Sequence, residues 1–169
     1  MDDTDSRRKD REEQREKQFS DNVLKAIRCE LEALGPIYEQ GIGGHVAPLV
    51  DGQILETRLA LTQDWFAVFA ANAIHLGRLD GKLSRRIVAV YALLKLLIEE
   101  FRINNDYLAA KEKVASEIRE RPNEIHLQQR QQGLHKWMVQ QAIRIKRTEV
   151  LAKAAVAELV ELLDEAGIK

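Results

Sequence analysis

Cysteine, proline and long apolar runs are scarce in this sequence, and each scarcity excludes a class of protein. A single cysteine, Cys29, excludes an internal disulfide framework and fits a reducing compartment. Three prolines and nine glycines in 169 residues leave room for long helices. The longest uninterrupted apolar run, Ile87 to Leu94, is well short of the roughly 18 to 20 residues that a membrane span requires. We therefore expect a cytoplasmic protein without disulfides.

Charges of both signs are nearly equal in number, at 26 Lys and Arg against 27 Asp and Glu. The net charge of −1 gives no general attraction to nucleic acid or to an anionic membrane. Apolar side chains begin at Phe19, so we expect a charged N-terminal extension at 1–18 and a single helical domain at 19–169. We interpret the extension as a solvated helix with i,i+4 ion pairs; a stalk near a membrane or a partner surface is the alternative.

Apolar side chains recur at helical spacing in four segments, which we place at about 8–34, 63–77, 84–118 and 123–166. Short turns join the last three segments, so these helices should alternate in direction. Residues near 72 should then face residues near 89. The pattern predicts an all-α fold, an up-down four-helix bundle.

The predicted helices are unequal in length. At a rise of 1.5 Å per residue, the helix at 63–77 spans roughly 22 Å and the one at 123–166 roughly 65 Å. The last two helices should therefore extend past the others as a long two-helix arm. One long loop, at about 36–62, should follow the stop signal Gly35-Pro36. Loops of this length are more often functional than short ones.

The buried faces of the last two helices follow from the same periodicity. On the third helix we expect a buried stripe at Ile87, Tyr91, Leu94, Ile98, Phe101 and Asn105, widened by Val90, Leu97 and Asn104. On the fourth helix the candidates for the buried side are Ile125, Leu134, Trp137, Met138, Ile145, Val150, Leu151, Ala155, Leu159 and Leu162.

The residues that usually carry catalysis form no recognisable pattern. The histidines His45, His75, His126 and His135 lack helical metal-binding spacing, and the serines have no histidine pattern around them. We expect no enzyme, no metal and no cofactor. The candidate ligand- or partner-binding residues are instead expected at the loop-covered end of the bundle and are His45, Asn104, Asn105, Tyr107 and Trp137.

Asn104 and Asn105 lie on an otherwise apolar helix face, and two interpretations are open. They are buried amides that fix the packing register, or they form the floor of a polar pocket under the loop. A basic stretch on the last helix is interpreted as a solvated face that pairs with acids of the first or third helix, with an anionic-lipid or nucleic-acid patch as the alternative. Its members are Arg130, Lys136, Arg144, Lys146, Arg147 and Lys153.

Two motifs of the central helices resemble a known family. They read Thr62-Gln63-Asp64-Trp65-Phe66-x-Val68-Phe69-x-x-Asn72-Ala73 and Arg86-Ile87-Val88-x-x-Tyr91-x-x-x-Lys95-x-Leu97-Ile98-x-x-Phe101-Arg102-x-Asn104-Asn105. Over about residues 20 to 108 the chain resembles a family of small bacterial all-helical proteins with no established activity. Many of those relatives carry an amino-terminal membrane helix and a charged stalk, which Ser6 to Lys17 resembles. The resemblance implies a soluble member or a chain whose membrane anchor precedes this sequence.

These observations together favour a bacterial helical interaction or scaffolding module that self-associates. The alternatives are the cytosolic part of a membrane-anchored sensor, on the inner face of the membrane, and a protein that recognises a small ligand or nucleotide at the loop-covered end. The protein partner is unknown, and we do not expect nucleic acid. Self-association should use the arm and the flanks of the third and fourth helices, because the arm holds more apolar residues than one seam can hide: Leu108, Val114, Ile118, Ile125 and Leu127.

Overall fold

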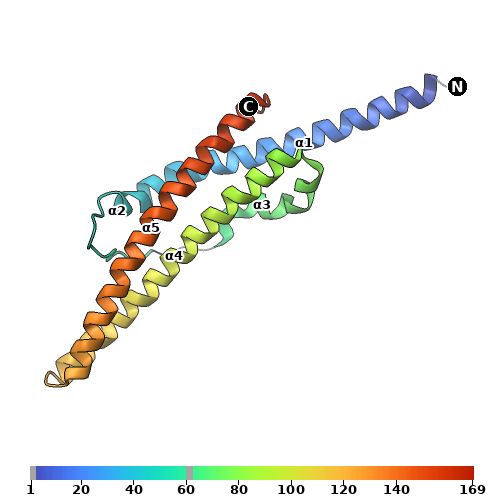
Figure 1. Ribbon diagram of the computed structural model, residues 1–169. Helices are drawn as coiled ribbons and strands as arrows, with labels where there is room; N and C mark the ends of the chain where they lie inside the picture. The colour runs from blue at the N-terminus through green and yellow to red at the C-terminus, as the bar shows by residue number, and fades with distance from the viewer. Residues whose placement is uncertain (1–2, 60–62) are drawn as a thin grey trace. The chain divides into compact units, whose positions relative to one another are not determined.

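The computed structural model describes residues 3–59 and 63–169, and every regular element in that part of the chain is helical (Figure 1). The predicted all-α class is therefore confirmed for the described residues. The long helices are α1 (Asp3–Tyr38), α4 (Gly81–Glu120) and α5 (Ile125–Glu165). Between α1 and α4 lie short elements: η1 (Glu39–Gly43), α2 (Gly44–Val46), η2 (Gln63–Phe66), α3 (Ala67–Asn72) and η3 (Ala73–Arg78).

The charged start of the chain is helical and continuous with α1. Its described side chains are solvent-exposed from Arg7 to Phe19. Arg8 and Glu12 form an ion pair of 3.5 Å at i,i+4 spacing. This agrees with the interpretation of the extension as a solvated helix.

The predicted loop at about 36–62 is wrong in its first part, because the chain stays helical from Pro36 to Val46. One of the clashes by which proline disfavours a helix is between its ring and the Cβ of the preceding residue, and this clash is absent here because that residue is Gly35. The continuation is also anchored, since the Tyr38 hydroxyl donates to Glu149 at 2.8 Å. Residues 60–62, the end of the predicted loop, lie outside the described residues.

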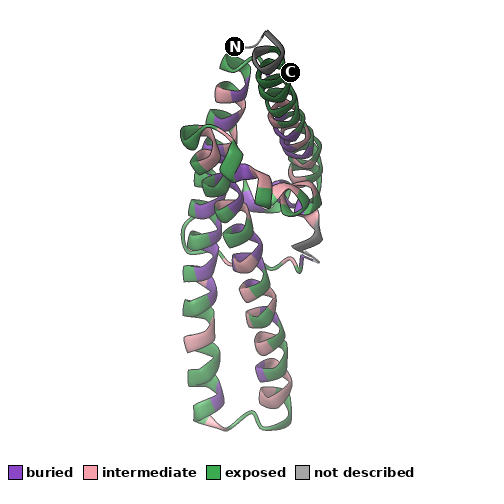
Figure 2. Ribbon diagram, turned by 90° about the vertical axis from the view of Figure 1, so that its right-hand side faces the viewer, coloured by how far each residue is buried: buried purple, intermediate pink, exposed green. Residues whose placement is uncertain are grey.

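The chain divides into two compact units. The first comprises Met1–Gly35, Asp64–Tyr91 and Ala155–Lys169, and the second comprises Pro36–Gln63 and Ala92–Ala154. Each unit holds its own buried apolar side chains, and Figure 2 shows such residues recurring along the long helices. The expected single domain at 19–169 stays a prediction.

The first unit buries side chains of α1, α4 and α5, at Val23, Leu24, Ile27, Leu31, Ile87, Val90, Tyr91, Leu159 and Leu163. The second unit buries Ile42, Val46, Leu55, Leu97, Phe101, Leu108, Met138 and Ile145. Burying such a side chain stabilises the fold by about 1.5 to 3 kcal/mol. The stripe predicted for α4 is confirmed at these positions, whereas Leu94 is half-buried.

A buried carboxylate organises the first unit. Glu30 of α1 accepts the backbone N–H groups of Val68 at 2.7 Å and Phe69 at 3.1 Å, and the Tyr91 hydroxyl at 2.7 Å. The first N–H groups of a helix have no partner inside it, so Glu30 caps α3 from a different helix. The Phe69 ring also stacks on Tyr91 with 3.9 Å between centroids. This pairing agrees with the register expected from the short turn.

The hairpin of α4 and α5 in the second unit hides more apolar surface than expected. Leu108, Val114 and Leu127 are buried, whereas Ile125 is 69% exposed. The two helices run antiparallel there, since Glu117 pairs with Arg130 and Glu100 with Gln141. Ile118 is half-buried, so three of the five apolar residues that favoured self-association through this arm are covered within the chain; self-association itself stays a prediction.

Phe101 is the test of the second core, because its side chain is 1% exposed. We expect Phe101→Ala to lower the free energy of unfolding by about 3 to 5 kcal/mol, the cost of lost burial plus a cavity. Leu96→Ala on the same helix, where the side chain is 45% exposed, should cost much less. Urea denaturation of both variants measures the difference; equal midpoints would contradict the assigned core.

The hydroxyl of Tyr91 gives a pH-dependent prediction. Burial, with the hydrogen bond to Glu30, raises the pKa of Tyr91 above its ordinary value of 10.0. The unfolded chain therefore loses this proton first, so the stabilisation is complete below about pH 10 and declines as pH rises further. Tyr91→Phe should cost about 1 to 3 kcal/mol at neutral pH, because Glu30 loses a donor.

The same variant should also lose less stability than the parent between about pH 9 and pH 11, measured by urea denaturation at each pH. Tyr107→Phe is the matched control, because that hydroxyl makes no hydrogen bond within the part of the chain that the structure describes. If Tyr91→Phe and the parent follow the same alkaline curve, the assigned role of the hydroxyl is wrong.

Candidate functional site

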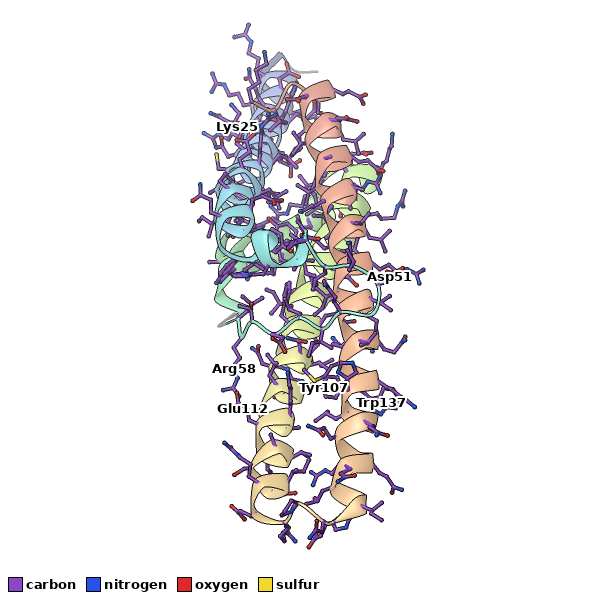
Figure 3. All side chains as sticks on the ribbon, turned by 90° about the vertical axis from the view of Figure 1, so that its left-hand side faces the viewer. Lys25, Asp51, Arg58, Tyr107, Glu112 and Trp137 are labelled. Carbon is purple, nitrogen blue, oxygen red and sulfur yellow. The ribbon has the colours of Figure 1, made fainter. Side chains whose placement is uncertain are left out.

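Residues 53–59 have neither helix nor strand structure, and we call them the crossing segment, because they run across α4 and α5 of the second unit (Figure 3). An extended backbone needs partners for its N–H and C=O groups. Asn105 supplies two, since its Nδ2 donates to the Leu59 carbonyl at 2.7 Å and its Oδ1 accepts the Leu59 N–H at 3.1 Å. Nδ2 of Asn104 donates to the Leu55 carbonyl at 3.1 Å. Side-chain amides of α4 thus replace a neighbouring strand.

Alternate residues of the crossing segment point inward. Leu55 and Leu59 are buried, whereas Glu56 and Arg58 between them are exposed and pair with Lys111 and Glu112 at 2.7 Å. Figure 3 shows Arg58 and Glu112 pointing toward one another. Exposed ion pairs contribute little, about 0 to 1 kcal/mol, so the amides and the two leucines hold the segment.

The five candidate binding residues lie in different surroundings, and their role in binding stays a prediction. Asn104 is 1% exposed and its amide nitrogen is engaged, while its Oδ1 accepts no hydrogen bond from the described residues. His45 is exposed, with Nδ1 at 3.4 Å from the Thr57 hydroxyl. Tyr107 is half-buried. Trp137 is 64% exposed.

The buried face of α5 differs from the predicted one. Four of the expected buried residues are exposed: Ile125, Trp137, Val150 and Leu151. The reason is that polar residues occupy the inner face, at Gln141, Thr148 and Glu149. Met138, Ile145, Ala155 and Leu159 are buried as predicted. For part of this helix, apolar periodicity alone therefore predicted the wrong buried face.

Glu100 and Gln141 form a buried polar pair that the sequence reading missed. Nε2 of Gln141 donates to the Glu100 carboxylate at 2.6 Å and to the Glu100 carbonyl at 2.8 Å. Arg144 donates to the same carboxylate at 2.8 Å. A buried carboxylate needs such donors, because leaving it unpaired costs several kcal/mol. A glutamate between Leu97 and Phe101 was the available signal in the sequence.

A second buried carboxylate joins the end of α1 to α5. Glu149 is 5% exposed and accepts from the Tyr38 hydroxyl at 2.8 Å and from Lys153 at 3.0 Å. Lys153 also pairs with Glu39 at 2.8 Å and lies 5.5 Å from the centre of the Tyr38 ring. Burial and the hydrogen bond to Glu149 raise the pKa of Tyr38 above its ordinary value. The polar groups of Tyr38, Glu149 and Lys153 are therefore engaged in contacts within the chain.

Three of the six residues of the basic stretch on α5 form ion pairs with acids, in line with its interpretation as a solvated face. Arg130 pairs with Glu117, Arg144 with Glu100, and Lys153 with Glu39 and Glu149. Lys146 donates to the backbone carbonyl of Leu49. Arg147 forms no ion pair within the described ranges 3–59 and 63–169.

The contact of Lys146 with Leu49 fixes a turn beside α5. The N–H of Gln53 donates to the Val50 carbonyl at 3.1 Å, and Gly52 has φ of 88°, the positive value that the third position of a type II turn requires. The N–H of Val50 donates to the Gln53 side chain at 3.2 Å. The turn therefore holds Asp51 at the outer side of α5, as Figure 3 shows.

Turn and helix together form an exposed apolar surface. Val50 is 61% exposed, Ile143 43%, Val150 59% and Leu151 49%. A groove of about 340 Å³ runs between them. Eight exposed residues line the groove, Gln53 and Lys146 among them. We call this the outer α5 surface and define it by the other six: Val50, Asp51, Ile143, Arg147, Val150 and Leu151.

No family model, no curated protein and no solved structure matches the chain. The resemblance to the bacterial family therefore stays a prediction. Among the described helices, none combines the length and the apolar character that crossing a membrane requires. The described residues also contain no group of three or more side chains placed to bind a metal ion.

Asn105 provides the test of the crossing segment. We expect Asn105→Ala to speed amide hydrogen exchange over residues 53–59, because the Leu59 N–H and carbonyl lose their partner. Overall stability should fall by about 1 to 3 kcal/mol. Asp106→Ala is the control, since it removes only an exposed ion pair with Arg102. Unchanged exchange in Asn105→Ala would show that the amide does not hold the segment.

Proposed function

We propose that the chain is a helical protein-interaction module, and that its partner binds at the outer α5 surface. The observation behind this proposal is four exposed aliphatic side chains lining one groove. Single exposed apolar residues are normal on soluble proteins, but a contiguous patch with a polar rim is typical of an interaction site. The charged residues Asp51, Lys146 and Arg147 also line the groove, Asp51 from the turn and the two bases from α5.

A binding role, and no catalytic one, also agrees with the hydrogen bonds that the buried acids accept. Glu30, Glu100 and Glu149 are carboxylates in apolar surroundings, where a catalytic acid or base is often found. Each accepts hydrogen bonds that join separate helices. We therefore propose a structural role for all three and no enzymatic activity.

We further propose that the helices form the up-down four-helix arrangement. The short connection between α4 and α5 and their antiparallel pairs support it, as does the capping of α3 by α1. We also propose a bacterial protein located in the cytoplasm. The single cysteine, Cys29, is exposed, and an exposed free thiol fits a reducing compartment.

A photo-crosslinking amino acid placed at Val150 tests the proposed surface in the host cell. We expect adducts of defined mass from Val150, and none from the same group at Gln140, which is exposed on α5 but does not line the groove. Adding Leu151→Asp should abolish the adducts, because a charge in an apolar contact is costly.

The thermal midpoint of Leu151→Asp should stay near that of the parent, since the side chain is 49% exposed. The same probe at Ile125, an exposed residue at the start of α5, examines the alternative surface at the end of the hairpin. Adducts from Ile125 and none from Val150 would overturn the proposed location.

A further inference from the structure

We infer that the outer α5 surface binds the same surface of a second copy about a two-fold axis, with Asp51 of each copy paired to Arg147 of the other. This inference rests on the proposed function and names its partner. A two-fold contact brings one patch against itself, so the patch must be complementary to itself. If residue 51 contacts residue 147 of the partner, the reverse contact follows by symmetry.

The charges of the patch meet that requirement. Asp51 is carried by the turn and Arg147 by α5, and both line the groove. Neither side chain forms an ion pair or a hydrogen bond with the described residues. The other cation of the groove, Lys146, is occupied by the Leu49 carbonyl. One acid and one base thus remain for a partner: Asp51 on the turn, and Arg147 on α5 at helical spacing between Ile143 and Leu151.

The apolar part of the patch fits a second copy as well. Val50, Ile143, Val150 and Leu151 are aliphatic and exposed, so pairing the patch with itself buries apolar surface from both copies. An anionic membrane or a nucleic acid would instead favour a cluster of bases, whereas Asp51 here would be repelled. A patch of this extent suits a weak dimer, with a Kd of about tens of micromolar.

Charge reversal in the purified full chain tests the pairing. Sedimentation velocity from about 1 to 500 µM should show the parent chain changing from monomer to dimer. Asp51→Arg and Arg147→Asp should each raise Kd about tenfold or more, because each homodimer then contains two like-charged pairs. Lys113→Asp, a reversal on the exposed side of α4, should leave Kd unchanged.

Mixing the two single variants is the decisive step. A heterodimer of Asp51→Arg with Arg147→Asp contains two opposite-charge pairs, one native and one exchanged, so the equimolar mixture should dimerise with a Kd near that of the parent. The chain carrying both substitutions should dimerise equally well. Each of these results would support the two-fold pairing.

Three results would overturn the inference: a monomer at every concentration, a dimer that ignores both reversals, and a mixture no tighter than its components. The proposed function fails separately. If the purified chain is monomeric and the adducts from Val150 have the mass of a different protein, the inferred dimer is wrong. The proposed interaction module would still be supported by that result. Absence of adducts from Val150 would remove the binding surface itself.

Discussion

A backbone that lies extended without a neighbouring strand must find its hydrogen-bond partners on side chains, and this requirement shapes the second unit. Asn104 and Asn105 of α4 supply those partners to Leu55 and Leu59. Because these hydrogen bonds set the position of the crossing segment along α4, they also set the position of the turn that precedes it. The aliphatic groove beside α5 exists only while the turn holds Val50 and Asp51 against that helix.

Three buried carboxylates serve a related purpose in the two units. A buried charge is destabilising unless several donors compensate it, so each position tolerates few alternatives. Glu30 collects two backbone N–H groups and a hydroxyl, whereas Glu100 collects an amide and a guanidinium. These acids specify which helices pack together and in which register. Leucine at the same positions would pack but would leave the donors unpaired.

Periodicity in the sequence was sufficient to place the long helices. Apolar residues at helical spacing located α4 and α5 to within a few residues, because those faces pack against the core along their whole length. The same rule failed for Trp137 and Val150, which are exposed while the polar Gln141 is buried. A hydropathy pattern records which side chains avoid water on average, and it does not record which polar groups find partners inside.

The candidate surface was harder to predict than the helices. The alternation of Leu55, Glu56, Thr57, Arg58 and Leu59 is the pattern of an extended segment, yet its partners on α4 lie 46 and 49 positions further along the chain. Local patterns in a single sequence do not reveal contacts between residues so far apart in the chain. The sequence drew attention to Asn104 and Asn105 as polar residues on an apolar face, and the structure shows that their amides bind the backbone of Leu55 and Leu59.

The capping of α3 has a consequence for the order in which the first unit folds. The helix spans Ala67–Asn72, holds no buried residue along that described length, and is far shorter than helices that are stable alone. Its first N–H groups are paired by Glu30, a residue 38 positions earlier. The helix therefore gains its stability only after α1 and α4 have met and closed that long loop of chain. Segment 63–78 is accordingly expected to fold last and to open first, in advance of global unfolding.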